Sequence, residues 1–177
     1  SRVSLGDVVS VGFPLLPEWK NSRFIPEEPS WLDESGKLYK EGINAYYKGR
    51  NEIALEHFRQ IEEFHPDTPW AIPSMFWSGQ LLALQGRYRA AAEKLKSFES
   101  ESEGVRFPLR GDFLHRSHYV RIWLELKKNR EDPQTLNLLK RELGRIADSQ
   151  IRFLLFELQL VVLESLGKLE KTVKLLY

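Results

Sequence analysis

Glycines at matched intervals, each followed by a small residue, constrain the fold of this 177-residue chain more than any other feature. Gly49 is followed five residues later by Ala54, and Gly86 is followed five residues later by Ala91. Glycine readily adopts the backbone conformation that ends a helix, and a small side chain lets a neighbouring helix come close. The two alanines stand 37 residues apart. This period predicts a repeated unit of two antiparallel helices joined by a tight turn.

Residues on both sides of the glycine breaks extend the same pattern. Gly42 and Gly79 each precede a break by seven residues, and Phe58 and Leu95 each follow the alanine by four. Two helices that approach closely need small residues at the contact and a large apolar residue one turn on to fill the remaining space. Gly167, close to the end of the chain, marks a weaker third copy.

Helical spacing of apolar residues continues from residue 30 to the end and predicts an all-α body. Pro17, Pro26 and Pro29 exclude a long helix from the region before it. Residues 1–29 therefore form either an extended arm or the remnant of a preceding domain, and Ser30 is the expected N-cap of the first helix. The predicted hairpins cover residues 30–65, 69–102, 111–147 and 148–177, approximately.

The spacing resembles the tetratricopeptide repeat (TPR), a helix-turn-helix unit that stacks into a right-handed superhelical solenoid. The marker positions of that family are occupied in the first copy by Leu38, Gly42, Gly49, Ala54, Phe58 and Pro66, and in the second by Met75, Gly79, Gly86, Ala91 and Leu95. Residues 64–95 are also similar to TPRs of bacterial cell-envelope assembly proteins. The resemblance implies a periplasmic or cell-envelope location, with a cytoplasmic location as the alternative.

The TPR resemblance also implies a concave groove lined by the first helix of each hairpin. The groove-facing family positions fall on Tyr39, Lys40, Ile43, Tyr46, Tyr47, Phe76, Trp77 and Gln80. Aromatic side chains of this kind are typical anchors of protein interfaces, so we expect the groove to bind a peptide or helix of another protein. The alternative is that these rings pack against the N-terminal arm, which carries Trp19 among its own apolar residues.

A second candidate surface is basic and lies around the fifth expected helix. It comprises Arg110, His115, Arg116, His118 and Arg121. We expect these side chains to be solvated or paired with acidic groups of the neighbouring hairpin. Two histidines without a nearby carboxylate ligand are a weak metal signal, so neither a metal nor another cofactor is predicted. Glu62 and Glu99, on expected helix ends, are predicted to be solvated.

Several classes of function find no support in the residues. The chain has no cysteine, which excludes thiolate catalysis and cysteine-ligated zinc, and it lacks phosphate-loop and nucleophile-elbow motifs. Its net charge of +1 gives no indication of nucleic-acid binding. The most apolar run, residues 151–166, contains Arg152, Glu157 and Glu164 and is too short to span a bilayer.

The resulting prediction is a non-catalytic scaffold that binds another protein. Two alternatives stay open: a cytoplasmic TPR adaptor or regulatory domain, and a structural spacer within a larger multidomain protein. The sequence predicts neither the identity of the partner nor the oligomeric state.

Overall fold

The computed structural model describes residues 14–19, 33–107, 109–129 and 133–168. These ranges contain seven α-helices and no β-strand, which confirms the predicted all-α class. Most of the expected arm and nearly all of the expected eighth helix lie outside the described residues. The chain divides into two compact units, residues 16–124 and residues 1–15 with 125–177, and each is described by itself.

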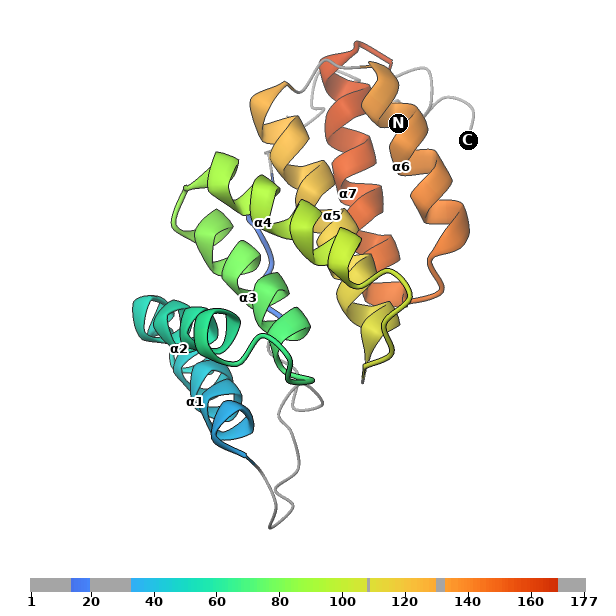
Figure 1. The fold of residues 1–177 in the computed structure, drawn as a ribbon. Coiled ribbons are helices and arrows are strands. Elements are labelled where there is room, and N and C mark those ends of the chain that lie inside the picture. The colour runs from blue at the N-terminus through green and yellow to red at the C-terminus, as the bar shows by residue number, and fades with distance from the viewer. Residues whose placement is uncertain (1–13, 20–32, 108, 130–132, 169–177) are drawn as a thin grey trace. The chain divides into compact units, whose positions relative to one another are not determined.

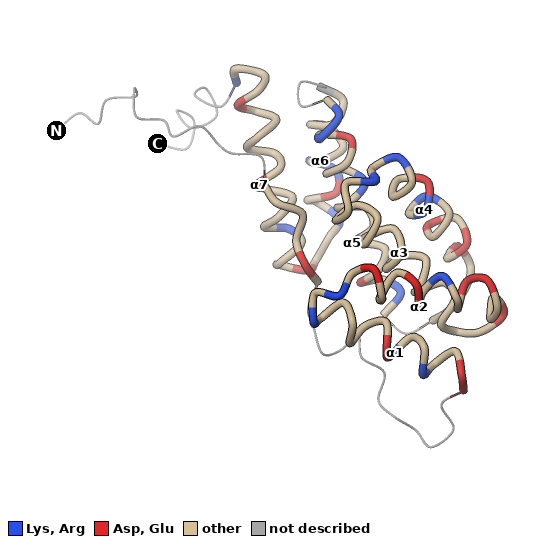
Figure 2. The backbone as a smooth tube through the Cα atoms, turned by 90° about the vertical axis from the view of Figure 1, so that its left-hand side faces the viewer, with Lys and Arg blue, Asp and Glu red and all other residues tan. Residues whose placement is uncertain are grey.

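Two helical hairpins form the core of the unit of residues 16–124 (Figure 1). The first hairpin joins α1 (Glu34–Tyr47) to α2 (Asn51–Phe64), and the second joins α3 (Ala71–Leu84) to α4 (Tyr88–Glu101). The hairpins pack on each other through α2 and α3. Twelve of the 14 residues of α3 are buried. Because α3 carries no charged residue, as its uniformly tan tube in Figure 2 shows, it can serve as the central helix of the unit.

The predicted glycine breaks all end helices. Gly49, Gly86 and Gly167 have φ angles of 73°, 76° and 64°, in the left-handed region that glycine tolerates. The N–H of Gly49 donates to the Tyr46 carbonyl and the N–H of Arg50 donates to the Ala45 carbonyl. The same pair of hydrogen bonds recurs after the other two helices. This is the Schellman arrangement, and it satisfies carbonyls that a helix end would otherwise leave without partners.

Close approach of the paired helices follows the small-to-large pattern predicted from the sequence. A Cβ atom at Gly42 would lie 2.9 Å from the ring of Phe58, and one at Gly79 would lie 2.7 Å from the side chain of Leu95. Ala54 and Ala91 are fully buried. In both hairpins, therefore, a glycine of the first helix makes room for a large apolar side chain of the second.

The first helix begins later than predicted. Asp33, not Ser30, is the N-cap of α1, and its Oδ1 accepts hydrogen bonds from Ser35 Oγ at 2.6 Å and from the Gly36 N–H at 2.7 Å. Both bonds favour the ionised carboxylate and hold the pKa of Asp33 below its usual value. The prediction of a cap at Ser30 is wrong because Asp33, which was assigned to the first turn, caps the helix itself.

The remaining helices are α5 (Arg110–Lys128), α6 (Pro133–Arg145) and α7 (Ser149–Ser165). The boundary between the two units falls within α5, after Leu124. Pro133 is the first residue of α6, a position where proline is favoured because its missing N–H would have no partner within the helix. In the C-terminal unit α6 packs against α7, although the two helices were predicted to belong to successive hairpins. Asp148 caps α7 by accepting hydrogen bonds from the N–H groups of Gln150 and Ile151.

Candidate functional site

Most of the predicted groove residues lie inside the unit of residues 16–124 and not on its surface. Only Lys40 and Tyr47 are half-buried; the other six are buried, and these are Tyr39, Ile43, Tyr46, Phe76, Trp77 and Gln80. The groove is therefore not open in this structure. Whether these residues bind a partner stays a prediction.

Trp77 of α3 is the centre of an aromatic cluster that joins the two hairpins. Its Nε1–H donates to the hydroxyl of Tyr39 on α1 at 2.9 Å, and its ring centroid lies 5.1 Å from that of Tyr46. Phe58 of α2 stacks on it at 6.2 Å, and Phe113 of α5 meets it edge-on at 6.0 Å. Aromatic pairs at such separations stabilise a core beyond their area burial.

Residues 16–19 of the N-terminal region bind to this cluster through their backbone. The N–H of Trp19 donates to the hydroxyl of Tyr46 at 2.8 Å, and Gln80 Nε2 donates to the carbonyl of Pro17 at 2.9 Å. Tyr46 belongs to α1 and Gln80 to α3, so the first helix of each hairpin contributes one hydrogen bond. The arrangement agrees with the alternative that the rings pack against the N-terminal arm.

The side chain of Trp19 is held from two directions. It is only 2% exposed, and its ring meets Tyr119 edge-on at 5.8 Å. The guanidinium carbon of Arg116, a residue that is 1% exposed, lies 5.2 Å from the centre of the Trp19 ring. A cation above an aromatic face gains about 2 kcal/mol when both are desolvated. Trp19 therefore stabilises a buried charge as well as filling space.

Burial changes the acidity of both tyrosines at this site. Removal from water raises the pKa of Tyr39 and that of Tyr46, because the charged phenolate is disfavoured in the core. Both hydroxyls are therefore neutral at neutral pH. Trp19 Nε1 and Gln80 Oε1 are buried without a hydrogen-bond partner among the described residues, so the contact between the segment and the helices is not fully satisfied.

The predicted basic surface is divided in the structure. Arg116 faces Trp19, whereas Arg121, His118 and Ser117 gather around the carboxylate of Glu99 on α4. Arg110 Nε donates to the carbonyl of Ser102 at 2.8 Å, and His115 is half-buried. Pairing of Arg121 with an acidic group of the neighbouring hairpin is confirmed, and His118 Nε2 lies 3.9 Å from the same carboxylate, but the five residues do not form one basic patch.

Two acidic residues were wrongly predicted to be solvated. The side chain of Glu99 is 15% exposed and that of Glu62 is 14% exposed. Glu62 accepts hydrogen bonds from Ser78 Oγ at 2.5 Å and from Lys94 Nζ at 2.6 Å. These partners lie 16 and 32 residues away along the chain, so no local pattern identifies them.

The described residues provide neither a metal-binding cluster nor a membrane-spanning helix. They contain no group of three or more His, Cys, Asp or Glu side chains placed to hold a metal ion. Within the same ranges, no helix combines the length and the apolar character needed to cross a bilayer. The chain matches no protein-family model, no curated protein and no solved structure.

Proposed function

We propose that this chain is a non-catalytic, TPR-like module that binds an extended peptide segment against the first helices of its hairpins. Two hydrogen bonds carry the proposal: the Tyr46 hydroxyl accepts one from the Trp19 N–H, and Gln80 Nε2 donates one to the Pro17 carbonyl. Side chains that bind backbone groups recognise an extended segment largely independently of its sequence. In this chain the position is occupied by the chain's own N-terminal segment.

The surroundings of Trp19 indicate what such a segment needs. Tyr119 contacts the edge of the indole and Arg116 lies over its face, so the site is matched to a large aromatic side chain. The preferred ligand is thus an extended segment of another protein that carries a tryptophan. Gln80 Oε1, which is buried and has no hydrogen-bond partner among the described residues, favours displacement, since a segment that donates a hydrogen bond to it gains about 1–3 kcal/mol.

The TPR-like part of the proposal is supported by the repeat of structure along the chain. Two successive hairpins share the same turn at Gly49 and Gly86 and the same small-to-large contact at Gly42 and Gly79. The resemblance to the TPR family implies in addition that such hairpins stack into a right-handed solenoid. The similarity of residues 64–95 to TPRs of bacterial envelope proteins is the reason for proposing a partner in a cell-envelope assembly.

Replacement of one side chain tests the peptide site in the full chain. In Trp19→Ala the N-terminal segment loses its aromatic anchor and should leave the site. A labelled peptide of residues 14–19, Pro-Leu-Leu-Pro-Glu-Trp, should then bind there, which a saturating rise in its fluorescence anisotropy would show. The unaltered protein should bind it at least about tenfold more weakly, because its tethered segment competes at an effective concentration near the millimolar range.

Leu15→Ala is the matched control, because Leu15 belongs to the same segment but is 90% exposed. This variant should behave as the unaltered protein does. A Trp19→Ala protein that keeps its helical circular dichroism but does not bind the peptide would refute the proposed peptide site.

A further inference from the structure

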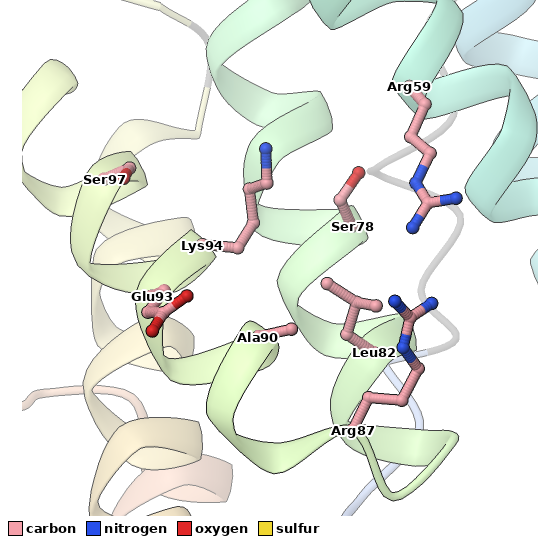
Figure 3. A pocket seen from close by; sticks show the side chains of 8 residues that line it. All are labelled: Arg59, Ser78, Leu82, Arg87, Ala90, Glu93, Lys94 and Ser97. Carbon is pink, nitrogen blue, oxygen red and sulfur yellow. The ribbon is translucent and has the colours of Figure 1, made fainter.

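A separate depression lies between α2, α3 and α4, away from residues 16–19. Its volume is ≈ 350 Å³, within the range of small-ligand pockets. Its lining includes Arg59 of α2, Leu82 of α3, Arg87 at the start of α4 and Lys94 of α4 (Figure 3). Arg59 and Arg87 take part in none of the side-chain contacts described above for the peptide site or for the packing of the hairpins.

The two arginines differ from the other charged groups around the depression. Lys94 is paired with Glu62 at 2.6 Å, and Glu93, the acidic residue of the lining, is paired with Arg89 at 3.1 Å. Within the part of the chain that the structure describes, the guanidinium groups of Arg59 and Arg87 have no hydrogen-bond or ion-pair partner. Figure 3 shows their guanidinium groups directed from opposite walls toward the same space above Leu82.

The backbone of Arg87 is held in place by the turn. Its N–H donates to the Leu82 carbonyl at 2.9 Å, and its carbonyl accepts from the Ala91 N–H at 3.0 Å. Arg87 is also the N-cap of α4, and no side chain caps that helix end. The N-terminus of α4 therefore adds a positive potential beside a guanidinium group whose main chain is fixed.

We propose that this depression binds a phosphate group. Two guanidinium groups on opposite walls provide two positive charges and several N–H donors, and no carboxylate of the described residues pairs with them. A tetrahedral dianion directs oxygen atoms toward both walls at once, whereas a carboxylate presents its two oxygens on one side. A phosphate also has room here, because the volume is about that of twelve water molecules at ~30 Å³ each.

Titration of the ¹⁵N-labelled full chain with inorganic phosphate tests the site, at neutral pH and with constant ionic strength. The amide signals of Ser78, Leu82 and Ala90 should shift and saturate together. The double variant Arg59→Ala/Arg87→Ala should bind phosphate at least about tenfold more weakly, because each charge-assisted hydrogen bond contributes roughly 1.5–3 kcal/mol. The amide spectrum of the variant reports at the same time whether it is folded.

The repeat supplies a matched control in Arg50→Ala/Lys96→Ala. Arg50 holds the place of Arg87 in the first hairpin, Lys96 follows Arg59 by the repeat period of 37, and both are exposed. This variant loses the same charge and should keep phosphate binding. An equal loss in both double variants, shifts scattered over the surface, or acetate binding as tightly as phosphate would each overturn the proposal.

Discussion

At the scale of single residues, two buried tyrosine hydroxyls connect the hairpins to each other and to the N-terminal segment. Tyr39 accepts a hydrogen bond from the indole of Trp77, and Tyr46 accepts one from the backbone of Trp19. Each hydroxyl satisfies a donor that would otherwise be buried without a partner. The aromatic side chains at these positions therefore act through their polar ends as well as through their rings.

Tyr39→Phe should lower the free energy of unfolding by about 1–3 kcal/mol at neutral pH, because the indole N–H of Trp77 loses its acceptor. At high pH, in contrast, the variant should lose less stability than the unaltered protein, because one buried tyrosine is gone. The pKa values of Tyr39 and Tyr46 are raised above 10.0, so their contribution to stability is complete below pH 10.0 and is lost as the pH rises above it.

Each of these two tyrosines costs roughly 1.4 kcal/mol per pH unit above that point, so Tyr39→Phe should show a smaller alkaline loss of stability than the unaltered protein. Urea denaturation at neutral pH and above pH 10 measures both effects. Equal alkaline slopes in the two proteins would contradict the placement of Tyr39 in the core.

At the scale of helices, close packing of each hairpin depends on a glycine in its first helix. Gly79→Ala places a Cβ atom 2.7 Å from Leu95, a fully buried side chain. Overpacking of this kind costs about 1–3 kcal/mol, which is more than the ~1 kcal/mol that alanine gains from its higher helix propensity. The variant should therefore be less stable in thermal or urea unfolding.

Gly111→Ala is the control for this change. Gly111 lies in the first turn of α5, and a Cβ atom there would meet nothing within 4 Å. Its stability should stay within about 0.5 kcal/mol of the unaltered protein or rise slightly. A Gly79→Ala protein as stable as Gly111→Ala would show that the helices do not approach as described.

Helices and turns were predictable because their signals are local. Gly49 and Gly86 end helices through backbone preferences that act within a few residues. The 37-residue period placed Gly42 opposite Phe58 and Gly79 opposite Leu95, so these two contacts could be predicted. The start of α1 was misplaced by three residues because both Ser30 and Asp33 are good N-cap residues.

The candidate site was only partly predictable. Its ring-bearing residues were found through the TPR resemblance, but the hydrogen bond from Gln80 to Pro17 joins residues 63 apart. No periodic pattern encodes such a contact. Burial of Arg116 was equally hidden, because arginine is mostly exposed and the partner ring of Trp19 lies far away along the chain.

At the scale of the whole molecule, acidic and basic side chains are distributed unevenly along the sequence. Residues 51–104 carry 5 basic and 9 acidic side chains, whereas residues 105–177 carry 14 basic and 9 acidic ones. Figure 2 shows acidic and basic positions interspersed along α4, whereas α2 carries one basic residue, Arg59, among four acidic ones. The pairing of Glu99 with Arg121 connects the acidic stretch to the basic one within the unit of residues 16–124.

The segment of residues 16–19 is the feature on which the account of function depends. It has no regular secondary structure, and its position relies on side chains of α1 and α3. Loss of the Tyr46 hydroxyl should therefore release the backbone of Trp19 while the hairpins stay folded, since Tyr46→Phe keeps the ring that packs on Trp77.

Hydrogen exchange at the Trp19 amide is the most direct measurement of this arrangement. In the full chain the Trp19 N–H should exchange at least about tenfold more slowly than an unstructured amide, and Tyr46→Phe should remove most of that protection. Exchange of the Trp19 amide at the unstructured rate in the unaltered protein would contradict the claim that the first helices bind this segment.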